Sequence, residues 1–112
     1  MAGAANTVCN LKALGAQVDF ISVVGDDQEG VEALDLLQSM GVSSAHVFIE
    51  RGRKTLVKTR IVSGGQVITR FDHGSTCVIS GSLSQAICER VGFIYSNYDA
   101  IVVSDYDKGV VS

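Results

Sequence analysis

The sequence predicts an α/β fold in which a parallel sheet is flanked by helices and interrupted by a small β lid insertion. Apolar residues at helical spacing alternate with short runs of β-branched residues. Two of these runs, 18–24 and 100–103, have the composition of strands buried in a parallel sheet. Between them lies a pair of strand-like segments joined by two glycines. The chain has 112 residues, which is the size of one small domain.

Composition and charge argue against several classes of protein. The net charge of −3 gives no reason to expect nucleic acid or an anionic membrane as a partner. No apolar run approaches the roughly 20 residues that span a bilayer, and the first six residues do not resemble a signal peptide. Cys9, Cys77 and Cys88 match neither a metal-ligand spacing nor a disulfide framework. We therefore expect a cytoplasmic protein with reduced thiols, in which Cys9 and Cys88 are small core residues.

Apolar residues recur every three or four positions in three stretches, and each predicts a helix: 4–14, about 27–40 and 83–91. Gly15 and Gly41 are expected to end the first two helices. In the second helix, Val31, Leu34 and Leu37 mark the side that faces the sheet. The third helix begins near Ser80 or Ser82, either of which can cap it.

The insert is expected to contain strands at 47–49, 55–63 and 66–72, which places the lid at about 46–72 and the core at about 1–45 and 82–112. Gly64 and Gly65 suit a two-residue hairpin turn. With this turn, Ile61 faces Ile68 and Thr59 faces Arg70 across the hairpin. Neither face is then cleanly apolar. The hairpin is therefore expected to cover a cleft or form an interface, rather than to be a layer of the core sheet.

Six of the nine Lys and Arg residues lie between positions 51 and 70, where no Asp or Glu occurs. Such a run is often only a solvated face. Because this segment is also strand-like, a surface that faces an anion is the competing interpretation.

Three turns carry residues suited to ligand binding, and each also has an ordinary structural explanation. Gly3-Ala4-Ala5-Asn6 opens a helix, where free N–H groups and the Asn6 amide suit a hydroxyl-rich ligand, but a plain helix start has the same composition. The segment 25–30 follows a predicted strand, and its Asp26 and Asp27 either cap the next helix or form a cleft floor. The segment 104–109 follows another strand and is either a surface turn or a loop that orients a sugar or a phosphate.

Together these segments resemble a known family. Gly3-Ala4-Ala5-Asn6, 14–16, 24–30 and Gly41-Val42 are similar to the N-terminal signature region of PfkB (ribokinase-like) carbohydrate kinases. The segments 55–60, 66–72 and 103–109 resemble the D-glycero-β-D-manno-heptose 7-phosphate kinase branch of that family. This branch is often the first half of a bifunctional enzyme of ADP-heptose (lipopolysaccharide core) synthesis. The resemblance covers nearly the whole chain and implies a partial ribokinase-like sheet.

The resemblance also implies roles for residues near the sugar. Gly3 and Asn6 are expected to touch sugar hydroxyls. Asp105 and Lys108 are expected near the sugar, where phosphoryl transfer takes place.

The resemblance makes the 54–72 hairpin a lid that covers the sugar and joins two subunits into a homodimer. Lys58 and Arg60 are expected to bind the phosphate that the substrate already carries, because that group needs cationic donors. Arg70 and Asp72 are weaker candidates, since the predicted register puts them on the other face.

Some features of the family are not found in this sequence. Ala2 stands where the family usually has the first of two glycines. Residues 1–112 contain neither the opening strand with its substrate-binding Asp nor the Gly-Ala-Gly-Asp segment that supplies the catalytic base and the anion hole. ATP and Mg²⁺ are therefore expected for the full-length kinase, while this chain alone is expected to hold neither and to show no turnover. The alternative is a free-standing sugar-phosphate binding or dimerisation module without catalysis.

Overall fold

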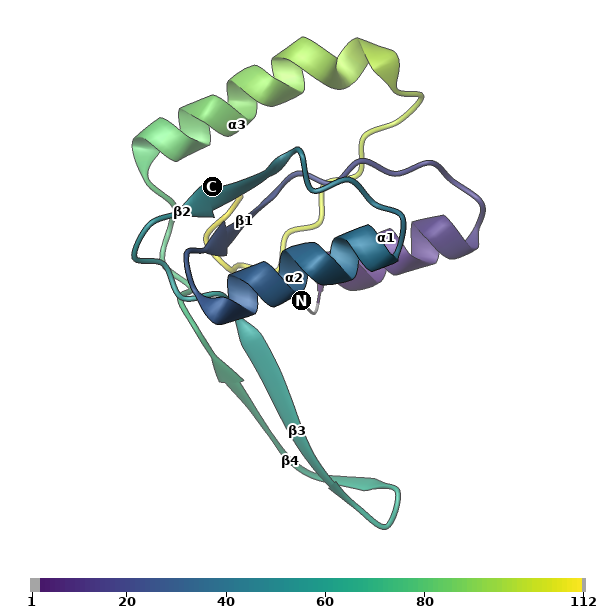
Figure 1. Cartoon of the computed structure of the whole chain (residues 1–112), viewed down its shortest axis with the longest axis vertical. Coiled ribbons are helices and arrows are strands. Elements are labelled where there is room, and N and C mark those ends of the chain that lie inside the picture. Colours follow the sequence, from purple (N-terminus) through teal and green to yellow (C-terminus); the bar gives the residue numbers. More distant parts are fainter. Residues whose placement is uncertain (1–2, 112) are drawn as a thin grey trace.

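The computed structural model describes residues 3–111, so Ala2 lies outside the described residues. The elements follow the chain in this order (Figure 1): α1 (Ala4–Ala13), β1 (Ser22–Gly25), α2 (Gln28–Ser39), β2 (Val47–Glu50), β3 (Val57–Ser63), β4 (Gln66–His73), α3 (Gly81–Ile94) and the 3₁₀-helix η1 (Tyr95–Asn97). Within residues 3–111, no helix is both long and apolar enough to cross a bilayer.

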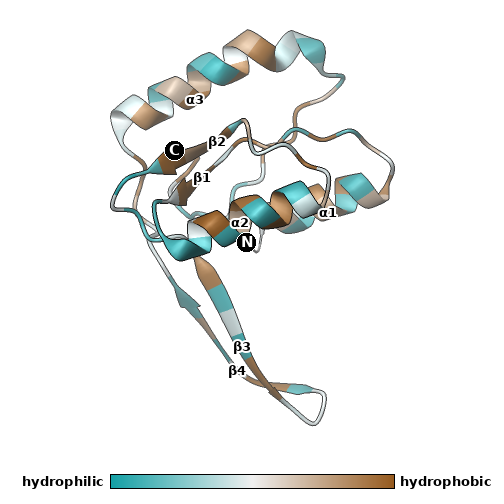
Figure 2. Ribbon diagram, in the orientation of Figure 1, coloured by the Kyte–Doolittle hydropathy of each residue, from teal (hydrophilic) through white to brown (hydrophobic). Residues whose placement is uncertain are grey.

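Strands β1 and β2 form a parallel pair in which Ser22 is opposite Val47 and Gly25 is opposite Glu50. In Figure 1, α1 and α2 lie on one side of this pair and α3 lies on the other. Both strands are apolar along most of their length (Figure 2), and β1 is the more buried of the two, since Ile49 in β2 is 58% exposed. The arrangement confirms the predicted α/β class. The strand 47–50, grouped with the insert from the sequence, pairs instead with β1.

The helix boundaries follow the capping residues that the sequence offers. The Asp27 carboxylate accepts a hydrogen bond from the Gly30 N–H at 3.0 Å and caps α2. The Ser80 hydroxyl accepts from the Leu83 N–H at 3.3 Å and caps α3. Gly15, at φ 88°, follows the end of α1 in the left-handed conformation that glycine adopts without strain. These predictions are confirmed.

The core lies between the two helices on one side of the sheet. Val8, Phe20, Leu37 and Val42 form its buried cluster, and Leu37 is fully buried. In α2 the buried residues Gly30, Ala33 and Leu37 are three or four positions apart and define the inward face. Val31 lies about 100° away from that face and is 53% exposed, which corrects its predicted inward position.

Two apolar stretches form less β-strand than the sequence predicts. The first strand spans four residues, 22–25, because only these have partners in β2. Residues 100–103, predicted as a buried strand, have no strand assignment, and Ile101, Val102 and Val103 are 59%, 59% and 71% exposed. A β-branched run becomes a strand only where a neighbouring strand takes its backbone hydrogen bonds, and no described strand does so here.

The cysteines are free thiols on the surface. This corrects the core positions predicted for Cys9 and Cys88. In α1 the buried side is formed by Ala5 and Val8, so Cys9 lies beside it. Cys88 belongs to α3, which has no fully buried residue.

Strands β3 and β4 form an antiparallel hairpin that projects away from the helices (Figure 1). Gly64 and Gly65 have φ values of 58° and 78°, as a two-residue turn of primed type requires. Beyond the turn the predicted register is wrong: Ile61 is opposite Thr69 rather than Ile68, and Thr59 is opposite Phe71. The reason is a β-bulge at 61–62, where β4 carries one extra residue, Ile68.

Leu37→Ala is expected to lower the free energy of unfolding by about 2–5 kcal/mol, because it opens a cavity in the buried cluster. Leu36→Ala is the matched control, since Leu36 is the adjacent residue on α2 and is 49% exposed. Its loss is expected to stay below about 1 kcal/mol. Urea denaturation measures both, and equal losses would contradict the assignment of the core.

Candidate functional site

The loop 104–109 lies against the N-terminus of α1, about 100 positions away in sequence. A Cβ atom on Gly3 would be 2.9 Å from Cδ2 of Tyr106, so the aromatic ring rests on a residue without a side chain. Thr7 Oγ1 lies 3.4 Å from Ser104 Oγ. The structure therefore brings together two of the turns that the sequence singled out. Asn6, near this contact, is exposed.

The loop is shaped by its own acidic residues. Asp107 has a φ of 55°, and no other described residue except glycine has a positive φ. The Asp107 N–H donates to Asp105 Oδ1 at 2.8 Å. Asp105 is exposed, and Lys108 is half-buried. This local turn presents the Asp105 carboxylate and the Lys108 side chain from one short segment.

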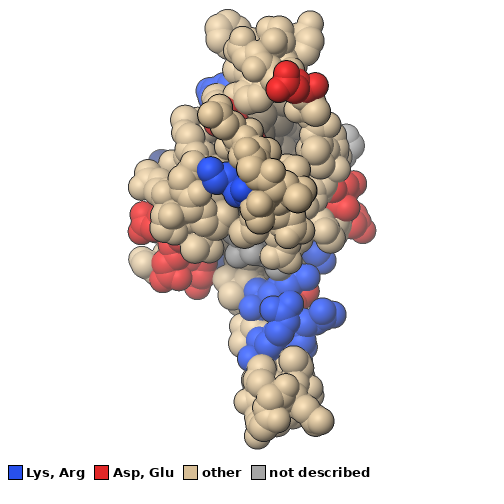
Figure 3. Space-filling view, turned by 90° about the vertical axis from the view of Figure 1, so that its right-hand side faces the viewer, with Lys and Arg blue, Asp and Glu red and all other residues tan. Residues whose placement is uncertain are grey.

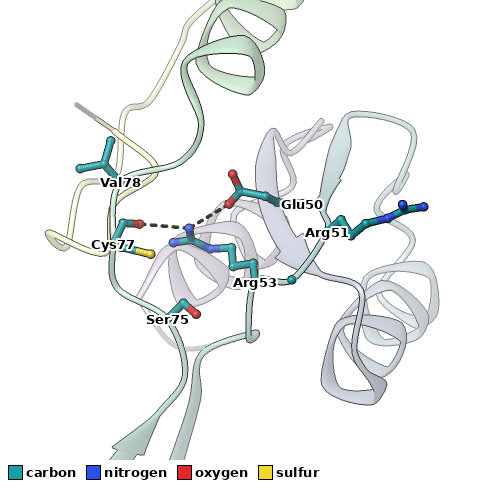
Figure 4. Close-up of a pocket in the computed structure, with 7 residues that line it drawn as sticks. Glu50, Arg51, Arg53, Ser75, Cys77 and Val78 are labelled. Atoms are coloured by element: carbon teal, nitrogen blue, oxygen red, sulfur yellow. Dashed lines mark hydrogen bonds and ion pairs between the residues drawn. The ribbon is translucent and has the colours of Figure 1, made fainter.

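Arg53 anchors the same loop from behind. The residue is only 7% exposed, and its guanidinium donates from Nη1 to Glu50 Oε2 at 3.1 Å and to the Cys77 carbonyl at 3.0 Å (Figure 4). Nη2 donates to the Lys108 carbonyl at 3.0 Å. Arg53 belongs to the basic region 51–70 of the sequence, but its guanidinium is bonded to these three acceptors within the fold.

Glu50, which is half-buried, completes this cluster. Its other oxygen, Oε1, accepts from the Ser80 N–H at 2.8 Å, so one carboxylate ties Arg53 to the start of α3. The hydrogen bond from Ser80, aided by Arg53 and opposed by desolvation, holds the pKa of Glu50 below its ordinary value. A carboxylate with a lowered pKa stays ionised at neutral pH, so Glu50 is an anion beside the Arg53 guanidinium.

Asp27 forms a second hydrogen-bonded cluster, between the start of α2 and the residues that lead into β3. Its Oδ1 accepts from Thr55 Oγ1 at 2.6 Å and its Oδ2 accepts from the Thr55 N–H at 2.8 Å. The buried Thr55 hydroxyl accepts in turn from the Gly25 N–H at 2.9 Å. Burial raises the pKa of Asp27, but the hydrogen bonds from Thr55 and Gly30 outweigh it and lower the pKa.

Asp26 also serves the backbone, because its Oδ1 accepts from the Gly52 N–H at 2.9 Å. Of the two interpretations left open for Asp26 and Asp27, the structure therefore favours the structural one. Both carboxylates fasten the turn after β1 to the segment that precedes the hairpin.

The bulge brings four predicted site residues onto one face of the hairpin. Lys58 is opposite Asp72 and Arg60 is opposite Arg70, and directly opposed side chains in an antiparallel pair share a face. Arg70 and Asp72 therefore lie on the same face as Lys58 and Arg60, which corrects the predicted separation. Figure 3 shows these cations as a blue patch on the half of the hairpin nearer the helices, while the tip is uncharged. We call this surface the cationic face.

The opposite face of the hairpin contains Val57, Thr59, Ile61, Thr69, Phe71 and His73. It carries neither Lys, Arg, Asp nor Glu, so the observed register separates charged from uncharged residues, whereas the predicted register gives two mixed faces. Phe71 and Ile61 are 53% and 48% exposed on this uncharged face.

A small hollow of about 190 Å³ lies at the base of the hairpin (Figure 4). It is lined by residues that precede the hairpin and residues that follow it: Glu50, Arg51, Gly52, Arg53, Ser75, Cys77 and Val78. Between residues 3 and 111, no group of three or more His, Cys, Asp or Glu side chains could hold a metal ion.

Comparison with known proteins gives a consistent result. Residues 1–109 match the family described as pfkB family carbohydrate kinase. Over all 112 residues the chain is 42% identical to Bifunctional protein HldE of Sulfurimonas denitrificans and 43% identical to that of Campylobacter fetus subsp. fetus, covering 24% of each relative. The protein of the same name from Helicobacter hepaticus is 36% identical and covered to 23%. The chain thus spans about a quarter of the length of the curated relatives it matches.

The free energy of unfolding is expected to fall as the pH drops from about 5 to about 3. Asp27 and Glu50 have lowered pKa values in the folded state, whereas unfolded Asp and Glu titrate near roughly 3.9 and 4.3. The unfolded chain therefore takes up protons at a higher pH than the folded chain, and this favours unfolding in acid. Asp27→Asn keeps a helix cap and is expected to weaken the pH dependence. Urea denaturation of wild type and Asp27→Asn at several pH values tests this. An equal pH dependence of the free energy of unfolding in the two proteins would contradict it.

Proposed function

Because the chain belongs to the pfkB family of carbohydrate kinases, we propose that it forms the sugar-binding and lid portion of an ATP-dependent heptose 7-phosphate kinase. The similarity of the segments 55–60, 66–72 and 103–109 to the heptose 7-phosphate branch supports this choice of substrate. The names of the matched relatives, each a bifunctional protein, agree with a kinase portion of a longer enzyme. We further propose that the protein is cytoplasmic and that β1 and β2 belong to a ribokinase-like sheet.

The cationic face is the observation that carries the proposal. Arg60 lies directly opposite Arg70, and like charges in this position repel each other. Among the described residues the structure contains an ion pair between Arg53 and Glu50. No ion pair there involves Lys58, Arg60 or Arg70. A phosphate dianion relieves such repulsion and accepts charge-assisted hydrogen bonds from several cations at once. In this proposal Lys58, Arg60 and Arg70 bind the existing phosphate, and Asp72, opposite Lys58, lies on the same face beside it.

The remaining site residues are proposed to bind the sugar. Gly3 and Asn6 at the start of α1 and Asp105 and Lys108 in the adjoining loop offer both donors and acceptors to hydroxyl groups. The packing of Tyr106 on Gly3 supports a shared site, because it fixes these two segments against each other.

The full-length kinase is proposed to use ATP and Mg²⁺. No group among residues 3–111 suits a metal ion, so the chemistry of nucleotide and metal is not assigned to this chain. A polypeptide of residues 1–112 alone is proposed to be inactive as a kinase, because its sequence contains no Gly-Ala-Gly-Asp segment to supply the base and the anion hole.

Lys58→Ala is expected to raise the Kd for heptose 7-phosphate by about tenfold or more, since a hydrogen bond to a charged group contributes about 1.5–3 kcal/mol. Isothermal titration calorimetry on the protein that contains residues 1–112 measures this. The affinity for the heptose without its phosphate is expected to change little. Lys54→Ala is the matched control, because Lys54 is exposed and uses its backbone, not its side chain, to hold Ser75.

Equal affinity of wild type and Lys58→Ala for heptose 7-phosphate would show that the phosphate is bound elsewhere. The second candidate function is a sugar-phosphate binding or dimerisation module without catalysis. Kinase assays of the full-length protein separate the two, because the module would bind heptose 7-phosphate without consuming ATP.

The uncharged face of the hairpin is proposed to join two copies of the protein into a homodimer. Phe71→Glu is expected to shift the protein from dimer to monomer, because it places a charge among the apolar residues of that face. Val67→Glu is the control, since Val67 is similarly exposed and opposite Val62 on the cationic side. Analytical ultracentrifugation measures both, and a Phe71→Glu variant with unchanged mass would contradict this interface.

A further inference from the structure

Arg53 stands where the chain enters the hairpin, and its side chain contacts three separate segments near the candidate site. It joins the end of β2 through Glu50, the segment after β4 through the Cys77 carbonyl and the 104–109 loop through the Lys108 carbonyl. A guanidinium presents its donors in a fixed fork, so it holds these acceptors in a defined geometry. The three segments are therefore placed relative to one another by one side chain.

The hairpin base is closed directly beside Arg53. The Lys54 N–H donates to Ser75 Oγ at 3.0 Å, and the Ser75 N–H donates to the Lys54 carbonyl at 2.9 Å. Gly74, just after β4, packs against the residue before β3, since an added Cβ would lie 2.6 Å from the Leu56 Cα. Because Arg53 and Cys77 flank this closed base on its two sides, their hydrogen bond sets how the hairpin leaves the rest of the molecule.

The 104–109 loop is fastened to the same place. The Ile79 N–H donates to the Gly109 carbonyl at 2.9 Å. Gly109 has a φ of 81°, and an added Cβ would lie 2.1 Å from the Cys77 carbonyl oxygen. Gly109 thus fits against Cys77 without room for a side chain, and Arg53 also holds the neighbouring Lys108 carbonyl.

We propose that Arg53 is a positioning residue that holds the hairpin base and the 104–109 loop in one arrangement, so that Lys58 and Lys108 bind the same ligand. We do not assign Arg53 to the ligand, because its side chain is 5% exposed and three of its five N–H donors are bonded within the fold. Lysine cannot replace it, since a single ammonium on a flexible stem does not span the three acceptors. The part of this proposal that concerns the ligand rests on the proposed function, and the part that concerns the two segments does not.

Hydrogen–deuterium exchange of the protein that contains residues 1–112 tests the structural part without any ligand. Arg53→Lys is expected to speed exchange of the Ser75, Ile79, Ser80 and Asp107 amides together by about tenfold, as loss of hydrogen bonds to a charged group implies. Exchange in α2 is expected to stay unchanged, which separates this local effect from a general loss of stability. Arg51→Lys is the matched control, because Arg51 is exposed and undergoes the same chemical change.

Unchanged exchange at these four amides, or an equal rise in α2, would overturn the proposal. If Arg53→Lys does not fold, Glu50→Gln takes its place, because it removes the charge beside Arg53 and keeps an acceptor for the Ser80 N–H. Glu50→Gln is expected to give the same pattern with smaller changes, and absence of that pattern would count equally against the proposal.

A double-mutant cycle tests the part that concerns the ligand. Calorimetry gives the Kd for heptose 7-phosphate of wild type, Arg53→Lys, Lys58→Ala and the double variant. If Arg53 acts by placing the hairpin, Lys58→Ala weakens the affinity less in the Arg53→Lys background than in wild type. A purely structural role gives additive losses of binding free energy. Additive losses would overturn the positioning role. Absence of binding by wild type would overturn the proposed function instead, and the exchange measurement then decides on Arg53 alone.

Discussion

The guanidinium of Arg53 lies almost entirely out of contact with water, and a charge in such a place must find acceptors within the protein. It finds the Glu50 carboxylate and two backbone carbonyls, each from a different part of the chain. Removing any of these acceptors would leave a buried donor unsatisfied, which costs more than the hydrogen bond itself contributes. The hairpin base, the start of α3 and the 104–109 loop therefore depend on one another through this residue.

A second constraint acts further along the hairpin. One extra residue in β4 shifts the pairing by one position, and a shift of one position in a strand moves every later side chain to the other face. Lys58, Arg60, Arg70 and Asp72 thereby meet on one side, and Phe71 joins Ile61 on the other. A local irregularity of the backbone thus separates a surface suited to an anion from a surface suited to apolar contact.

The two acidic residues after β1 show how a sequence pattern can be consistent with two roles until the structure is known. Asp27 stands where a helix cap is expected, but its carboxylate also receives both donors of Thr55, which lies 28 positions away. The sequence offered the cap from adjacent residues, whereas the long-range bonds depend on how β1 and the segment before β3 come together. The same holds for Arg53, whose position within a basic run pointed toward a surface role.

The sequence by itself determined the α/β class, the three helices with their caps and the turn at Gly64 and Gly65, because each depends on residues within a few positions of one another. It also carried the likeness to the carbohydrate kinase family, since that likeness rests on short segments in order. Only the tertiary structure decided the pairing of β2 with β1, the bulge, the exposure of 100–103 and the burial of Arg53. Those features depend on which distant partner satisfies a backbone group or a charge, and that choice is made by packing rather than by local pattern.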